Sequence, residues 1–101
     1  MARIVGIFEN GSTVGDVVDQ LQFNNITDIH VVEAGQNIDN VVQQMPALGV
    51  PHDQIDEYRR RLEAQRWLVI VQASALELPT VQRAFRSAQA LDIDLLPESA
   101  A

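Results

Sequence analysis

Residues 48–72 read LGVPHDQIDEYRRRLEAQRWLVIVQ. The proline of this stretch presets the backbone for a helix start. Ile55, Tyr58 and Leu62 then recur at the three- and four-residue spacing that predicts one buried helix face. The apolar run 67–72 predicts a strand directly after that helix. We expect the other segments to pack against this helix and strand.

The remaining segments predict three more strands and three more helices. The strands are expected over residues 3–8, 29–34 and 93–96, and the helices from Ser12 or Thr13 to Asn24, over 38–45 after Asn37 and before Pro46, and from about Pro79 to Ala88. This order implies an α+β fold with a four-stranded antiparallel sheet on the ferredoxin-like split βαβ plan, helices on one face, and an extra helix between strands two and three. Right-handed crossovers would put strands one and three in the centre. We expect residues 1–97 to form one domain and residues 98–101 a flexible tail.

The two central strands are expected to be apolar on both faces. A sheet with one solvated face alternates apolar and polar residues, but 3–8 and 67–72 do not. The second face therefore needs a cover, which would be the 38–45 helix, a second copy of the chain, or both. The residues predicted to make a contact between copies are Val5, Ile7, Leu68 and Ile70.

Composition excludes several classes of protein. The 101 residues suit a single domain with its own core. The chain has no cysteine, which excludes disulfides, thiol chemistry and iron–sulfur clusters. A net charge of −7 disfavours nucleic acid and anionic membranes as main partners. Since we see no signal peptide and no apolar run long enough to span a bilayer, we expect a cytoplasmic protein.

The positive charge lies in the second half of the chain. Residues 1–50 carry a net charge of −5, whereas residues 59–86 carry +4. Two acid-first pairs, Asp56 with Arg60 and Glu57 with Arg61, are expected on the 51–64 helix. The arginines form either a patch for an acidic protein partner or a solvated face with local pairs; they are Arg59, Arg60, Arg61, Arg66, Arg83 and Arg86.

Little in the sequence indicates catalysis or metal binding. No phosphate-binding loop, dinucleotide fingerprint or G-x-S-x-G motif is present, and no histidine and acid spacing makes a ligand set. We therefore expect no catalytic residue, no metal and no cofactor. His30, Tyr58 and Trp67 would line a pocket if the domain binds a small molecule, and would otherwise be structural.

Several short motifs together resemble a known family. They are GIF at 6–8, VV at 31–32, LGVP at 48–51, Tyr58, LEA at 62–64 and LVIV at 68–71. Over residues 3–96 the chain resembles the bacterial general stress protein domain, the heat-induced stress protein family. That family often has glycine where Gln65 stands here. The resemblance implies a ferredoxin-like fold and an association with stress response, and it carries over no catalytic residue.

The leading hypothesis is a non-catalytic, stress-associated interaction domain that self-associates through its sheet face. The expected homo-oligomer is a dimer. The alternative is a small-molecule-binding or cofactor-free enzyme domain of the dimeric ferredoxin-like type. A third hypothesis is regulation through an acidic protein partner at the arginines, which would be sensitive to salt.

Overall fold

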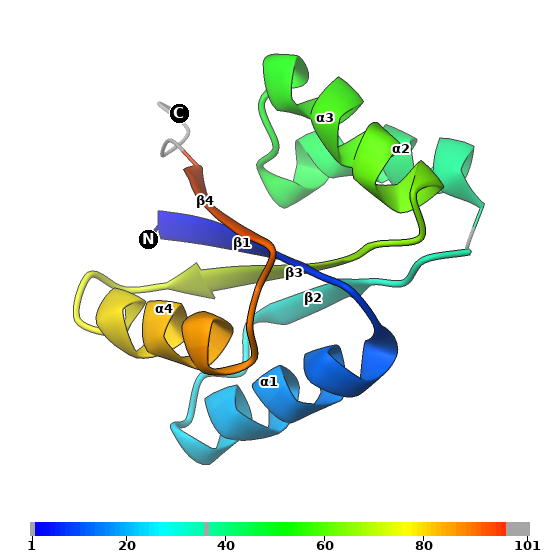
Figure 1. Cartoon of the computed structure of the whole chain (residues 1–101). Coiled ribbons are helices and arrows are strands. Elements are labelled where there is room, and N and C mark those ends of the chain that lie inside the picture. The colour runs from blue at the N-terminus through cyan, green and yellow to red at the C-terminus, as the bar shows by residue number, and fades with distance from the viewer. Residues whose placement is uncertain (1, 36, 97–101) are drawn as a thin grey trace.

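The sheet has four antiparallel strands with β1 and β3 in the centre. A computed structural model describes residues 2–35 and 37–96 (Figure 1). The strand order is β2-β3-β1-β4, and every neighbouring pair is antiparallel. The strands are β1 (Ala2–Phe8), β2 (Ile29–Val32), β3 (Trp67–Ala73) and β4 (Asp92–Leu96). The predicted α+β class, antiparallel sheet and central strands are confirmed, whereas the tail predicted at 98–101 lies outside the described residues.

Four α-helices and one 3-10 helix connect the strands. They are α1 (Gly11–Phe23), α2 (Ile38–Gln44), the 3-10 helix η1 (Met45–Leu48), α3 (His52–Glu63) and α4 (Leu78–Ser87). Between β2 and β3 the chain therefore carries α2, η1 and α3. The predicted cap of α1 is wrong, because Asn10 caps that helix by accepting a hydrogen bond from the Thr13 amide at 3.0 Å. Helix α2 ends at Gln44, before Pro46 as predicted, and Pro46 lies in the 3-10 helix η1 that follows directly.

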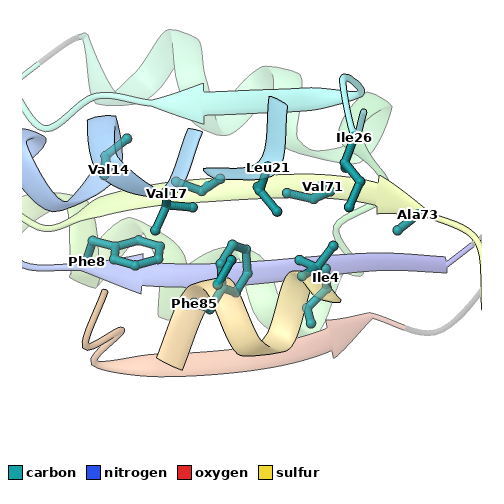
Figure 2. Packing of buried hydrophobic residues seen from close by; sticks show 12 residues of the cluster. Ile4, Phe8, Val14, Val17, Leu21, Ile26, Val71, Ala73 and Phe85 are labelled. Carbon is teal, nitrogen blue, oxygen red and sulfur yellow. The ribbon is translucent and has the colours of Figure 1, made fainter. Parts of the chain in front are cut away.

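One face of the sheet packs against α1 and α4 (Figure 1). The rings of Phe8 and Phe85 meet edge to face with centroids 5.4 Å apart. Figure 2 shows these rings beside Val17 and Leu21 of α1. All four side chains are fully buried, so this layer is a continuous aliphatic and aromatic core.

The opposite face of the sheet packs against η1 and α3, on the other side in Figure 1. The side chains of the segment 45–62 that are buried there are Met45, Val50, Tyr58 and Leu62. The prediction of helices on one face only is therefore wrong. The segment 45–62 carries enough apolar side chains to cover the second face itself, while α2 has no fully buried residue and packs at the margin.

The predicted contact between copies is corrected by the same observation. Val5, Ile7 and Leu68 have 0% exposure within the single chain, and Ile70 has 4%. All four side chains lie in the core under η1 and α3. A second copy cannot reach them while these helices are in place.

Three helices end in the same capping geometry without glycine. After α3, the Gln65 amide donates to the Leu62 carbonyl and the Arg66 amide to the Arg61 carbonyl, both at 3.0 Å. This is the Schellman pattern, which requires a left-handed residue after the cap. That residue is Gln65 with φ 67°, and Asn25 with φ 63° and Gln89 with φ 60° hold the equivalent places after α1 and α4.

Replacing Gln65 or Gln89 with glycine is expected to raise the free energy of unfolding by roughly 1 kcal/mol each, because a left-handed conformation costs other residues about 1–2 kcal/mol. Chemical denaturation measures the change. The control is the same substitution inside α4, Gln82→Gly, which should lower stability by about 1 kcal/mol. A loss of stability at both Gln65 and Gln89 would show that their side chains, not their backbones, matter.

Candidate functional site

A hollow of about 200 Å³ opens between the sheet and η1. Its lining combines three strands with the 3-10 helix, and the residues are Arg3, Asp28, His30, Ala47, Leu48, Ile70 and Gln72. We call it the Arg3 hollow. It is smaller than the roughly 300–1,000 Å³ of pockets that hold drug-sized ligands. The hollow therefore has room only for a small molecule or for one residue of a larger one.

Strand register brings the polar side chains of the hollow together. Arg3 of β1 is paired with Gln72 of β3, and His30 of β2 is paired with Ile70 of β3. Directly opposed residues place their Cβ atoms about 4.5–5.5 Å apart on one face. The backbone N–H of Gln72 also donates to the backbone carbonyl of Asp28 at 3.0 Å, which holds residue 28 beside β3. Side chains from positions 3, 28, 30 and 72 thus converge, although they are far apart in the sequence.

Gly49 leaves room for the Arg3 side chain. Gly49 follows η1 with φ 86°. A Cβ built there would lie 2.5 Å from Arg3 Cδ and 2.8 Å from both Nε and Nη1. The arginine therefore passes across the bare backbone of Gly49. Within the described residues, its guanidinium has no carboxylate within 4.0 Å.

The LGVP motif acquires a structural explanation from this contact. Leu48 lines the hollow, Gly49 admits Arg3, and Val50 is buried in the core of the second face. Pro51 is the N-cap residue of α3. The motif joins η1 to α3 and forms one wall of the hollow.

Gly49→Ala is expected to lower the free energy of unfolding more than Gly35→Ala does. Gly35 has φ 87°, and a Cβ added there would meet nothing within 4 Å, so alanine costs only the backbone term of about 1–2 kcal/mol. At Gly49 the added Cβ would also displace the end of the Arg3 side chain, which adds roughly 0.5–1.5 kcal/mol of rotamer strain. Denaturant unfolding of both variants measures the difference.

The added cost at Gly49 should disappear in an Arg3→Ala background, because the two side chains are in direct contact and their effects are not additive. If Gly49→Ala lowers the free energy of unfolding equally with and without the Arg3 side chain, the added methyl group does not collide with Arg3.

Tyr58 lies outside the Arg3 hollow. Its side chain is fully buried in the second-face core, and its hydroxyl donates to Asp94 Oδ2 of β4 at 2.9 Å. Burial, and after it the hydrogen bond to Asp94, raises the pKa of the Tyr58 phenol well above its ordinary value. The hydrogen bond connects α3 to the edge strand.

Folded protein is expected to keep Tyr58 un-ionised as pH rises past about 10, the ordinary value for tyrosine. The unfolded chain binds this proton less tightly, so stability is fully present below pH about 10 and declines above it. Tyr58 is the only tyrosine, and tyrosinate absorbance therefore reports it directly. The urea-unfolded chain is the control. Ionisation near the ordinary pKa with native circular dichroism retained would contradict the buried placement.

The predicted pocket of His30, Tyr58 and Trp67 does not form. His30 lines the Arg3 hollow, Tyr58 is bonded to β4, and Trp67 packs on the α1/α4 side of the sheet. The indole of Trp67 crosses Gly11, where an added Cβ would lie 2.9 Å from Cζ2. Trp67 belongs to the central strand β3 and is not part of the Arg3 hollow.

The predicted arginine patch is divided between elements and partly neutralised. Four arginines form ion pairs with carboxylates, namely Arg59 with Asp39 at 2.7 Å, Arg60 with Glu57 at 3.2 Å, Arg61 with Glu57 at 3.2 Å and with Asp92 at 3.3 Å, and Arg66 with Glu9 at 4.0 Å. The predicted Glu57–Arg61 pair is present, whereas Arg60 pairs with Glu57 in place of Asp56. Arg83 and Arg86 lie on α4, which packs on the other face of the sheet.

Sequence reasoning identified one side chain of the hollow, His30, and missed Arg3, Asp28 and Gln72. One signal was available for Arg3, which is the only arginine or lysine among the first 50 residues. Among residues 2–35 and 37–96, no three histidine or acidic side chains are placed to hold a metal ion. No helix of that part of the chain has the length and apolar composition needed to cross a bilayer.

Neither the scan against protein-family models nor the search of curated proteins finds a match for this chain.

Proposed function

We propose that the chain is a non-catalytic, stress-associated binding domain of the ferredoxin-like type that forms a dimer. The strand order β2-β3-β1-β4 with α1 and α4 as crossovers supports the split βαβ assignment. In this scheme α2, η1 and α3 are an insertion where the plan has a hairpin. The stress association rests on the LGVP-containing motifs. Its test is the abundance of the protein after a heat shock, and an unchanged level would count against it.

The surface that favours self-association is the outer side of α1 and α4. Asp16, Asp19 and Phe23 recur on α1 opposite its buried side, and Arg83 and Arg86 do so on α4. We call these five residues the α1/α4 face. All of them are exposed. Among the described residues, none of the four charged side chains has an ion-pair partner within 4.0 Å.

The arrangement of charge on this face is self-complementary. Helices α1 and α4 pack side by side and run in opposite directions (Figure 1). One half of the face is therefore acidic and the other half basic. Under a twofold axis, each acidic half would meet the basic half of the second copy, as an isologous contact requires. The observation that carries the proposal is that the α1/α4 face bears acidic and basic side chains without ion-pair partners among the described residues.

Apolar side chains at one end of the two helices add to the surface. Phe23 at the end of α1 is 88% exposed, and Leu76 just before α4 is 92% exposed. Because exposed ion pairs contribute only about 0.2–1 kcal/mol each, we expect a weak dimer that forms at high micromolar concentration and dissociates as salt is added.

A charge-reversal experiment tests this dimer. Asp16→Arg/Asp19→Arg makes the whole face basic, and Arg83→Asp/Arg86→Asp makes it acidic. Each variant alone should be monomeric in sedimentation equilibrium, and an equimolar mixture of the two should restore dimers. Asp53→Arg/Asp56→Arg, the same change on α3, is the control and should leave the dimer intact. A wild-type chain that stays monomeric at high micromolar concentration, or a mixture that fails to associate, would refute the proposal.

A second function, small-molecule binding, is favoured by the Arg3 hollow, which lies on the opposite face of the sheet from α1 and α4. The arginines of α3 give no comparable support to an acidic protein partner, since Arg59, Arg60 and Arg61 already pair with carboxylates of the chain.

A further inference from the structure

The Arg3 hollow combines a positioned cation with further polar groups and an apolar wall. The Arg3 guanidinium is partly buried against Gly49 and has no carboxylate partner among the described residues. Arginine presents paired N–H donors that match the two oxygens of a carboxylate. Because the Arg3 side chain already lies against the backbone of Gly49, it has less conformational freedom to lose when an anion binds than a fully solvated arginine has.

The remaining lining restricts what kind of anion fits. Asp28 lies in the same hollow as Arg3, and its negative charge disfavours a dianion such as phosphate. The carboxylate of Asp28 would accept a hydrogen bond from a donor group of the ligand. Leu48 and Ile70 offer an apolar surface between the polar groups. A suitable ligand has one carboxylate, one N–H donor and a short aliphatic part.

We propose that the Arg3 hollow binds an α-amino carboxylate of about the size of leucine, with its carboxylate on Arg3 and its nitrogen donor toward Asp28. Two sources share this chemistry, a free amino acid and the carboxyl-terminal residue of a peptide. The volume of about 200 Å³ accommodates one such residue. This site does not depend on dimer formation, because the α1/α4 face lies on the other side of the sheet.

Titration of the ¹⁵N-labelled chain with leucine, N-acetyl-leucine and leucinamide, followed by amide chemical shifts, tests the proposal. Leucine or N-acetyl-leucine should shift the amides around the hollow in a saturable manner, whereas leucinamide, which lacks the carboxylate, should not. Tighter binding of leucine would identify the free amino acid as the source, and tighter binding of N-acetyl-leucine would identify a peptide end. Binding of leucinamide with equal affinity, or of inorganic phosphate more tightly than both carboxylates, would overturn the assignment.

Two variants link the binding to the hollow. Arg3→Gln should weaken it by roughly tenfold to a hundredfold, the usual worth of hydrogen bonds to a charged group. Arg60→Gln, the same substitution on α3, is the control and should leave the affinity unchanged. Ala47→Phe places a ring at the exposed edge of the hollow and should block binding even where Arg3→Gln alters the fold. Unchanged affinity in either Arg3→Gln or Ala47→Phe would place the ligand elsewhere.

Discussion

Replacing Leu68 with alanine is expected to lower the free energy of unfolding by about 2–5 kcal/mol, the usual range for a buried leucine. Leu68 has no exposed surface and lies in the core that η1 and α3 form with the sheet. The truncation leaves a cavity between the sheet and the helices. The neighbouring side chains can relax into it only partly. Urea denaturation at low micromolar concentration measures the loss for the monomer.

The matched control is Leu76→Ala, which removes the same atoms from a side chain that is 92% exposed. It should change stability by no more than about 0.5 kcal/mol. If Leu68 instead made a contact between copies, its truncation would weaken association and leave the monomer nearly as stable as before. That result would show that α3 does not cover the second face in solution.

Replacing Phe85 with alanine is expected to lower the free energy of unfolding by about 3–5 kcal/mol. The ring is fully buried between α4 and the sheet. It also loses its edge-to-face contact with Phe8, whose centroid is 5.4 Å away, and such pairs add roughly 0.5–1.5 kcal/mol beyond burial. Thermal and denaturant unfolding both measure the effect.

Phe23→Ala is the matched control for this substitution, because the Phe23 ring is 88% exposed at the end of α1. At low micromolar concentration, where a weak dimer is absent, it should leave stability within about 0.5 kcal/mol of the unchanged chain. Similar losses of stability in Phe85→Ala and Phe23→Ala would contradict the placement of Phe85 in the core and of Phe23 on the surface.

Helix and strand identities could be predicted because they depend on short-range periodicity. Ile55, Tyr58 and Leu62 share one side of α3, and that side is the one turned to the core. The start of α1 could not be located as well, because Asn10, Ser12 and Thr13 are all good capping residues. Only the observed hydrogen bond from the Thr13 amide to Asn10 distinguishes them.

The candidate site was less predictable than the fold. His30 was recognised from its residue type, but Arg3 and Gln72 meet only through the pairing of β1 with β3, which joins distant parts of the sequence. Tyr58 and Trp67 were expected beside His30 and are not, since Tyr58 extends from α3 to Asp94 of β4 and Trp67 lies on the opposite face of the sheet.

By itself the sequence determined that strands β1 and β3 need cover on both faces, because alternation along a strand assigns side chains to faces without any knowledge of the rest of the fold. The tertiary structure alone decided what that cover is. A second copy or a helix of the same chain could cover these apolar strands equally well. Which of the two covers them depends on the path of the chain between β2 and β3. Here Gly49 turns the chain from η1 into α3, so that Val50, Tyr58 and Leu62 reach the sheet. The same turn leaves Arg3 in an open hollow. Stretch 48–72 therefore covers most of the second face of the sheet and also forms part of the wall of the Arg3 hollow.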